Sequence, residues 1–248
     1  MMSLRRDAGS QTAEPVADPL AGSSWSRRET VAGFAASPPN ATLMRFAQHQ
    51  LERAPGGRRV IDIGCGAGRN AIPLAAAQGW TVVGTDLSLP MLEAARERAN
   101  DNGVSSRTCF ALAAMDCLPA ADSSCDLVIA HGIWNLASSA AIFRRAVREG
   151  ARVAKDGAGL FVFTFSRATL PPDATPVAGE PFVFTDFSGE PQCFLTADEL
   201  LTELGAAGFE PDAAVPLTEL NRDARAAFGG GRPVIYQSAF RRVERRAR

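Results

Sequence analysis

Four short groups of residues have types and a spacing that could bind a polar ligand. The first is the glycine-rich run Ile63-Gly64-Cys65-Gly66-Ala67-Gly68, and the second is a single acid, Asp86. The third is Met115-Asp116-Cys117, and the fourth is His131, one of only two histidines in the chain. Together they offer backbone N–H donors, carboxylate acceptors and one imidazole, which are groups that recognise a small polar molecule.

The glycine-rich run joins a strand predicted at residues 59–63 to a helix predicted at residues 70–78. Glycine permits a tight turn there and lets a ligand come close to the backbone. The N-terminus of the following helix presents free N–H groups that suit an anionic group such as a carboxylate. The G-x-G-x-x-G spacing of dinucleotide sites is not met, because Gly68 comes one position early and Arg69 follows it. The run therefore predicts a ligand site and disfavours a dinucleotide.

Two aspartates follow later strands of the same pattern. Asp86 ends the second predicted strand, where a carboxylate can accept hydrogen bonds from both ribose hydroxyls of a nucleoside. The alternative role for Asp86, capping the next helix, suits Ser88 better because Ser88 is closer to that helix. Asp116 could accept a hydrogen bond from an adenine amino group, with Met115 and Leu87 on the two faces of the ring. The alternative for Asp116 is a solvated turn residue before a proline.

His131 is the candidate catalytic residue. It directly follows the fourth predicted strand, at the carboxyl edge where ligands bind in open α/β sheets. Three roles stay open for it: a general base, a contact to the substrate, or a residue whose backbone lines the cofactor pocket.

These residues need a sheet whose strands all end at one edge, and the chain predicts such a sheet. Short apolar runs alternate with helical segments, and two more short strands begin at Phe209 and Pro233. This order predicts the α/β class, with a doubly wound and mostly parallel sheet covered by helices on both faces. The five main strands are expected at residues 59–63, 80–85, 107–112, 126–130 and 159–165.

The chain divides into three predicted parts. Residues 1–24 are expected to be a flexible segment, residues 25–56 a helical N-terminal cover, and residues 57–248 the ligand-binding domain. Residues 166–191 interrupt the domain with a Pro- and Gly-rich insertion that we expect to act as a lid or substrate wall. Phe184 and Phe187 within it are expected to wall an apolar substrate pocket.

Composition excludes several other classes of protein. The net charge of -1 does not favour nucleic acid as a partner, and no apolar run is long enough to span a membrane. The five cysteines form no CxxC pair, so neither a disulfide framework nor a metal site is expected. We expect a cytoplasmic protein, and the single lysine among many arginines and alanines hints at a bacterial genome rich in G and C.

In combination, these motifs resemble those of class I S-adenosylmethionine-dependent methyltransferases. The resemblance spans about residues 58–242, through 60–68, Asp86, Met115-Asp116 with Leu118-Pro119, and 125–129. It implies a Rossmann-like seven-stranded sheet whose last strand is antiparallel. It also implies that S-adenosyl-L-methionine is the cofactor, with Asp62 near its amino group. The other cofactor-binding residues it implies are Gly64, Gly66, Gly68, Asp86, Leu87, Met115, Asp116 and Cys117.

The resemblance further implies methyl transfer to a small-molecule acceptor by in-line attack on the sulfonium methyl. The layout is most similar to small-molecule enzymes of the tellurite and thiopurine methyltransferase type, acting as a monomer or homodimer. Two alternatives remain. An NAD-type oxidoreductase is disfavoured by Arg69 and by the lack of a hydride-transfer constellation. A non-catalytic protein that only binds S-adenosylmethionine would keep the same motifs.

Overall fold

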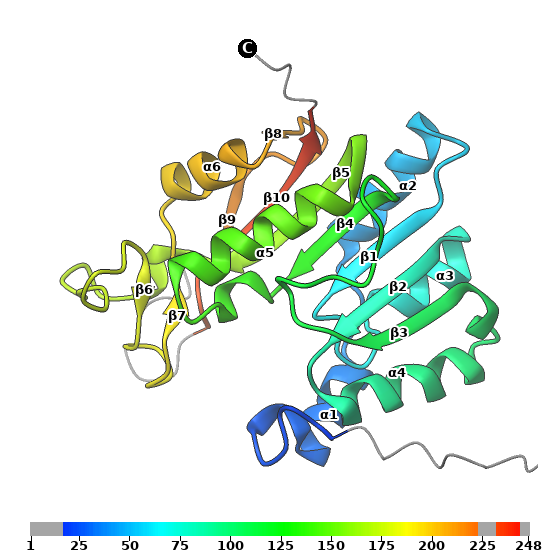
Figure 1. The fold of residues 1–248 in the computed structure, drawn as a ribbon, viewed down its shortest axis with the longest axis horizontal. Helices are drawn as coiled ribbons and strands as arrows, with labels where there is room; N and C mark the ends of the chain where they lie inside the picture. The colour runs from blue at the N-terminus through cyan, green and yellow to red at the C-terminus, as the bar shows by residue number, and fades with distance from the viewer. Residues whose placement is uncertain (1–16, 223–231, 244–248) are drawn as a thin grey trace, which may run out of the picture.

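The computed structural model describes residues 17–222 and 232–243, and these residues form one α/β unit around a central sheet (Figure 1). The strands follow the order β3-β2-β1-β4-β5-β10-β8. Strands β1 to β5 pair in parallel, and β10 runs antiparallel between β5 and β8. The predicted doubly wound, mostly parallel sheet with an antiparallel last strand is therefore confirmed.

The strands of this sheet are β1 (Arg59–Ile63), β2 (Thr81–Asp86), β3 (Thr108–Leu112), β4 (Cys125–His131), β5 (Ala154–Phe165), β8 (Phe209–Pro211), β9 (Thr218–Leu220) and β10 (Ile235–Arg242). The helices are α1 (Arg28–Ala36), α2 (Ala41–Arg53), α3 (Ala71–Gln78), α4 (Leu89–Asp101), α5 (Ala140–Val153) and α6 (Ala197–Ala206). Most bounds agree with the sequence to within two residues, but β5 begins earlier than predicted, because Ala154 pairs with Cys125 before an irregularity in the ladder.

One edge of the sheet differs from the expected seven strands. Both β8 and β9 pair antiparallel with β10, β8 near its end and β9 near its start. The sequence predicted a single edge strand, beginning at Phe209, beside the last strand. In the structure two short strands, β8 and β9, occupy that edge. The short edge strands leave few unpaired backbone groups exposed along β10.

Side chains alternate between the two faces of the sheet, as the pleat requires. On one face, Ile61 and Val162 pack with α5 and α6 in one buried cluster. On the other face, Val60 and Phe161 pack with α2, α3 and α4 in a second cluster. Figure 1 shows α5 in front of the sheet, with α2 and α3 behind it. Because β1, β2 and β4 run parallel, their carboxyl ends meet at one edge of the sheet.

Polar caps fix where the helices near this edge begin. Asn40 caps α2, with its side-chain oxygen accepting from Thr42 N and Leu43 N. Ser88 caps α4 through its hydroxyl and the N–H of Met91, so Ser88 does the capping that was the alternative role for Asp86. Thr196 and Glu199 form a capping box at the start of α6. Each cap is worth about 1 kcal/mol of stability.

The insertion at residues 166–191 has little regular structure of its own. A short 3-10 turn, Arg167–Thr169, leads to β6 (Val183–Phe184), which pairs antiparallel with β7 (Gln192–Cys193). Two of its side chains, Leu170 and Phe184, form a small buried cluster with Phe194. No helix in the described ranges is long and apolar enough to cross a lipid bilayer.

Candidate functional site

The glycine loop turns sharply at the carboxyl end of β1. Gly64, Gly66 and Gly68 have φ values of +67°, +53° and +74°, in the left-handed region that favours glycine. A Cβ on Gly64 would also lie 2.7 Å from the side chain of Ile133, in the segment after β4. A Cβ on Gly66 would meet nothing closer than 3.8 Å. The loop is therefore held tightly against the end of β4 at Gly64 and has more room at Gly66.

Asp86 ties the end of β2 to the glycine loop. Its Oδ2 accepts a hydrogen bond from Gly66 N at 2.9 Å, and its Oδ1 accepts one from Ser88 N at 2.9 Å. Burial raises the pKa of Asp86, and these backbone hydrogen bonds act in the opposite direction. A carboxylate offers about four lone-pair positions, so two remain for further donors such as ribose hydroxyls.

Asp62, the fourth residue of β1, is 1% exposed, and its Oδ2 has no hydrogen-bond partner among the described residues. Burial raises the pKa of Asp62 to about 7, with the charge of Arg69 acting in the opposite direction. An unpaired buried carboxylate oxygen costs free energy unless a donor reaches it. This oxygen fits a cationic donor such as an α-ammonium group.

Arg69 is a site residue that sequence reasoning missed, since Arg69 served only as an argument against a dinucleotide. Its Nη2 lies 2.8 Å from Nδ1 and 3.2 Å from Nε2 of His131. Among the described residues, no carboxylate oxygen lies within 4.0 Å of the guanidinium. The acid Asp62 and the unpaired cation Arg69 together complement the ammonium and carboxylate of an amino-acid group. The chemistry of this donor set fits the methionine part of S-adenosylmethionine.

His131 is half-buried at the end of β4 and stacks on Phe163, with ring centroids 4.2 Å apart and planes 7° from parallel. Its Nε2 lies 3.2 Å from the amide nitrogen of Asn40, which also donates to Gln237 Oε1 at 3.0 Å. The structure therefore brings His131 together with Arg69, Asn40 and Gln237. Asn40 and Gln237 were not predicted, because each lies far from His131 in the chain.

The third motif faces α5. Asp116 Oδ2 accepts hydrogen bonds from Arg145 at 3.0 Å and 2.8 Å, so one oxygen of this carboxylate is occupied by the protein itself. Met115 is half-buried and packs against the core, whereas the thiol of Cys117 is exposed. An adenine contact from Asp116 would have to use its other oxygen.

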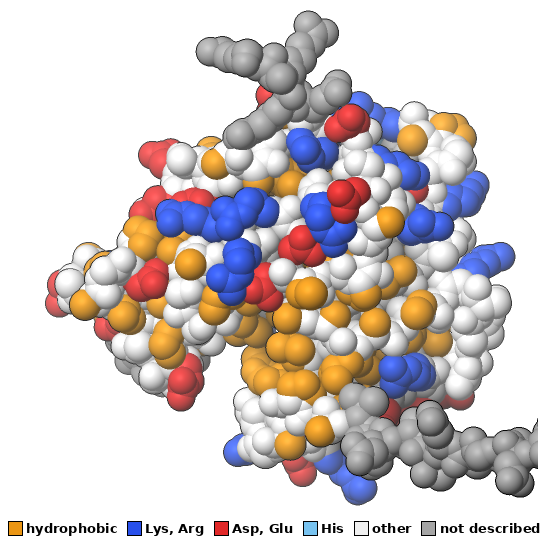
Figure 2. Space-filling view, viewed as in Figure 1, with side chains coloured by type: hydrophobic (Ala, Val, Ile, Leu, Met, Phe, Trp, Pro, Cys, Tyr) orange, Lys and Arg blue, Asp and Glu red, His pale blue; other side chains and the backbone are white. Residues whose placement is uncertain are grey.

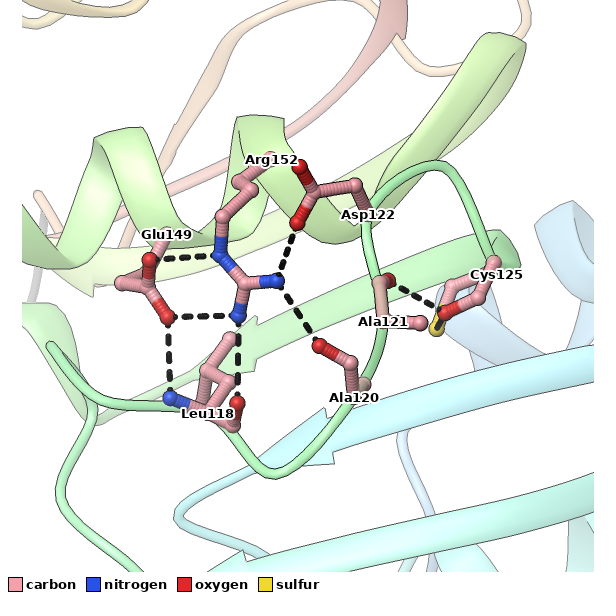
Figure 3. Close-up of polar contacts among 8 residues, drawn as sticks. Leu118, Ala120, Ala121, Asp122, Cys125, Glu149 and Arg152 are labelled. Atoms are coloured by element: carbon pink, nitrogen blue, oxygen red, sulfur yellow. Dashed lines mark hydrogen bonds and ion pairs between the residues drawn. The ribbon is translucent and has the colours of Figure 1, made fainter.

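Arg152 of α5 holds the segment that follows this motif (Figure 3). Its guanidinium donates to the backbone oxygens of Leu118 and Ala120, at 3.1 Å and 2.8 Å. Glu149 accepts from Arg152 and also from Leu118 N at 2.9 Å. These contacts fix the path of the chain between β3 and β4, and with it the position of Met115.

The N-terminal cover packs beside Asp86. Asp18 Oδ1 accepts from Leu89 N at 3.1 Å, and Ser88 Oγ donates to the carbonyl oxygen of Trp25 at 3.2 Å. Phe34 of α1 lies next to Gly66. Residues 17–24, assigned from sequence to the flexible segment, thus make specific contacts, while residues 1–16 lie outside the described part of the chain.

The carboxyl edge opens on a hollow between the β6–β7 hairpin and α1, and hydrophobic side chains gather on both sides of it (Figure 2). The two phenylalanines predicted to wall a pocket differ in exposure. Phe187 is 43% exposed and packs on Phe165 with ring centroids 5.1 Å apart, whereas Phe184 is 4% exposed and belongs to the buried cluster. Phe187 is therefore the one available to a ligand.

Comparison with known proteins follows this geometry. A family model described as a methyltransferase domain matches residues 60–157. The methyltransferase GfsG of Streptomyces halstedii is 39% identical over 138 residues, which are 54% of this chain and 48% of that protein. The 27-O-demethylrifamycin SV methyltransferase of Amycolatopsis mediterranei is 33% identical over 197 residues, 74% of this chain and 67% of that protein. The chain thus spans about half the length of the first relative and two thirds of the second.

Among solved structures, a similar one is the 1,6-didemethyltoxoflavin-N1-methyltransferase of Burkholderia thailandensis, with bound substrate and S-adenosylhomocysteine. The TM-score is 0.61 at 16% identity, covering 82% of this chain and 79% of the other. At this identity the likeness establishes the shared fold.

Proposed function

Because this chain belongs to the class I S-adenosylmethionine-dependent methyltransferases, we propose that it transfers the methyl group of that cofactor to a small-molecule acceptor. One observation carries the proposal. A buried acid with an unpaired oxygen, Asp62, lies near a guanidinium without a carboxylate partner, Arg69, at the glycine loop. An amino-acid group satisfies both charges at once, and the cofactor has such a group.

The residues would hold the cofactor in three places. Asp62 and Arg69 take the ammonium and carboxylate, with Gly64, Gly66 and Gly68 giving the backbone room to approach. Asp86 accepts from the ribose hydroxyls through its remaining lone pairs. The residues that enclose the adenine are Leu87, Met115, Asp116 and Cys117.

The bound cofactor supplies a methyl group already activated by a sulfonium. The protein has to orient the acceptor in line with the methyl–sulfur bond and keep water out, which can contribute about 7–11 kcal/mol. The carboxyl ends of β4 and β5 bring His131 and Phe163 to the edge where the acceptor would lie. The N-terminal cover and the β6–β7 hairpin border the hollow on either side.

A small apolar or aromatic acceptor suits this hollow. The names of the relatives describe methyl transfer to demethylrifamycin SV and to didemethyltoxoflavin, both small organic molecules. The net charge of -1 argues against nucleic acid, whose binding depends on many basic side chains. Tellurite and thiopurine compounds, which the motif layout suggests, are the first acceptors to test. A non-catalytic role would leave cofactor binding intact and give no turnover with any acceptor.

Replacing Asp86 tests the cofactor site. Asp86→Ala removes the acceptor proposed for the ribose and the contact to Gly66 N, so we expect S-adenosylhomocysteine to bind about tenfold more weakly or worse. Calorimetric titration gives the dissociation constant, and Asp173→Ala, at an exposed acid, is the matched control. An unchanged dissociation constant in a folded Asp86→Ala protein would remove the ribose assignment.

A further inference from the structure

The turn that carries Asp116 lies directly beside the end of β2. Ala113, the residue after β3, donates its N–H to the carbonyl oxygen of Asp86 at 3.1 Å. Cys117 N then donates to Ala114 O at 3.1 Å, which closes a turn around Asp116. Asp116 therefore lies in the first turn after the strand that neighbours β2, close to the acid proposed to bind the ribose.

One side of α5 holds the connection between β3 and β4. Arg145, Glu149 and Arg152 are spaced four and three residues apart, so they lie on the same side of the helix. Glu149 and Arg152 contact backbone groups of the chain that follows the turn (Figure 3). Arg145 instead contacts a side chain, the carboxylate of Asp116. Loss of Arg145 would therefore release this carboxylate without releasing the path of the chain.

The guanidinium of Arg145 uses two nitrogens on one oxygen of Asp116. Nε and Nη2 donate to Oδ2 at 3.0 Å and 2.8 Å, whereas Oδ1 accepts no hydrogen bond among the described residues. Rotation of the carboxylate would break both contacts, so the pair fixes the direction of Oδ1 and leaves its lone pairs free.

Stability does not account for this pair. The side chain of Arg145 is 52% exposed and that of Asp116 is 20% exposed. Ion pairs at the surface contribute little to the free energy of unfolding, because water screens them and two side chains lose freedom. The effect that the contact can supply is the orientation of the carboxylate.

We propose that Arg145 is a positioning residue, which holds one oxygen of Asp116 so that the other accepts a hydrogen bond from the amino group of adenine. The inference rests on the proposed function and assigns the recognition of the base to this pair. A carboxylate held in one direction selects the amino donor strongly. A freely rotating carboxylate loses orientational freedom when it binds, and therefore selects that donor less.

Calorimetric titration of the full-length protein with two ligands tests the inference. One ligand is S-adenosylhomocysteine, and the other is its analogue with hydrogen in place of the 6-amino group of the purine. Since hydrogen bonds to charged acceptors are strong, we expect wild type to prefer the amino ligand by about tenfold or more. Arg145→Ala should lower this preference to about threefold or less and shift the thermal unfolding midpoint by no more than about 3 °C. An unchanged or larger preference in Arg145→Ala would overturn the proposal, as would equal binding of both ligands by wild type.

Arg144→Ala is the matched control. Arg144 is the neighbouring residue of α5, its side chain is 44% exposed, and it donates through Nε and Nη2 to Glu203 of α6. We expect this variant to keep the wild-type preference for the amino ligand. A fall equal to that of Arg145→Ala would mean that the effect comes from α5 as a whole, and would contradict a specific role for Arg145.

A double variant shows whether Arg145 acts through Asp116. In Asp116→Asn the remaining oxygen is taken by Arg145, so the amide nitrogen faces the adenine amino group and the preference should be lost. Adding Arg145→Ala to Asp116→Asn frees the amide to turn its oxygen toward the adenine, and part of the preference should return. The absence of any recovery would mean that Arg145 does not orient this side chain.

The same titrations separate this inference from the proposed function. Failure of wild type to bind S-adenosylhomocysteine would overturn the proposed function. Binding of S-adenosylhomocysteine without preference for the amino group would overturn only the role given to Arg145 and Asp116.

Discussion

Asp62 illustrates how a single buried group links the fold to ligand binding. Its carboxyl group is enclosed, and burial raises its pKa to about 7, whereas an aspartate in an unfolded chain has a pKa of about 3.9. Between those two pH values the folded protein holds a proton that the unfolded chain has lost. The free energy of unfolding contributed by Asp62 therefore falls as the pH rises from about 4 to about 7.

Asp62→Asn should remove this dependence, since an amide mimics the protonated acid and does not titrate. Without ligand, we expect the stability of the Asn variant relative to wild type to increase from pH 5 to pH 8, by up to about 1.4 kcal/mol per pH unit. Urea unfolding at several pH values measures the difference. His131 titrates in the unfolded chain of both proteins, and its contribution cancels in the comparison. A difference that stays constant with pH would show that Asp62 is already ionised.

For single residues, the sequence indicated which side chains lie at the ends of strands better than it indicated which groups they contact. Asp86 was recognisable because it ends a strand just before a helix start, and Asp62 was implied by the resemblance of residues 60–68 to the family's first motif. The contact of His131 with Asn40 was not, because these residues are 91 positions apart and only the docking of α2 brings them together. Arg145 likewise gives Asp116 a partner that no local pattern indicates.

The glycine loop is the element on which the site depends. Gly64 and Gly103 both have positive φ values, +67° and +66°, but only Gly64 has a side chain, that of Ile133, within 4 Å of where a Cβ would lie. Gly64→Ala should therefore lose more stability than Gly103→Ala, which carries only the backbone cost of about 1–2 kcal/mol. We also expect Gly64→Ala to weaken S-adenosylhomocysteine binding, with partial recovery when Ile133→Ala is added.

Thermal unfolding and calorimetry of these variants give both quantities. Equal losses of stability in Gly64→Ala and Gly103→Ala would mean that the nearby side chain of Ile133 adds nothing to the cost of a Cβ at Gly64.

Most helices and strands were predictable from the sequence, because hydrophobic periodicity and caps such as Thr196 with Glu199 are local signals. The edge strand β9 was not, since its three residues are held by pairing with β10 rather than by their own pattern.

At the scale of the molecule, the hollow between the insertion and the N-terminal cover is where an acceptor would enter. Phe187→Ala removes an exposed ring, so we expect little change in stability and a raised KM for any acceptor that the wild type methylates. Phe184→Ala removes a buried ring and should cost about 3–5 kcal/mol of stability. Steady-state kinetics and urea unfolding separate the two effects, with exposed Val177→Ala as the control. An unchanged KM in Phe187→Ala would rule out this ring as part of the acceptor site.

The overall architecture followed from the sequence because alternating strands and helices admit few topologies. The shape of the hollow did not. It depends on how residues 17–36 dock beside Asp86 and on the β6–β7 hairpin, and both are set by long-range packing rather than periodicity.

The most direct test of the account is calorimetric titration of the purified protein with S-adenosylhomocysteine, with NADH as the comparison ligand. The account predicts a dissociation constant on the order of micromolar for S-adenosylhomocysteine and no measurable binding of NADH. Binding of NADH alone would contradict the reading of the glycine spacing, and with it the roles given to Asp62, Arg69 and Asp86.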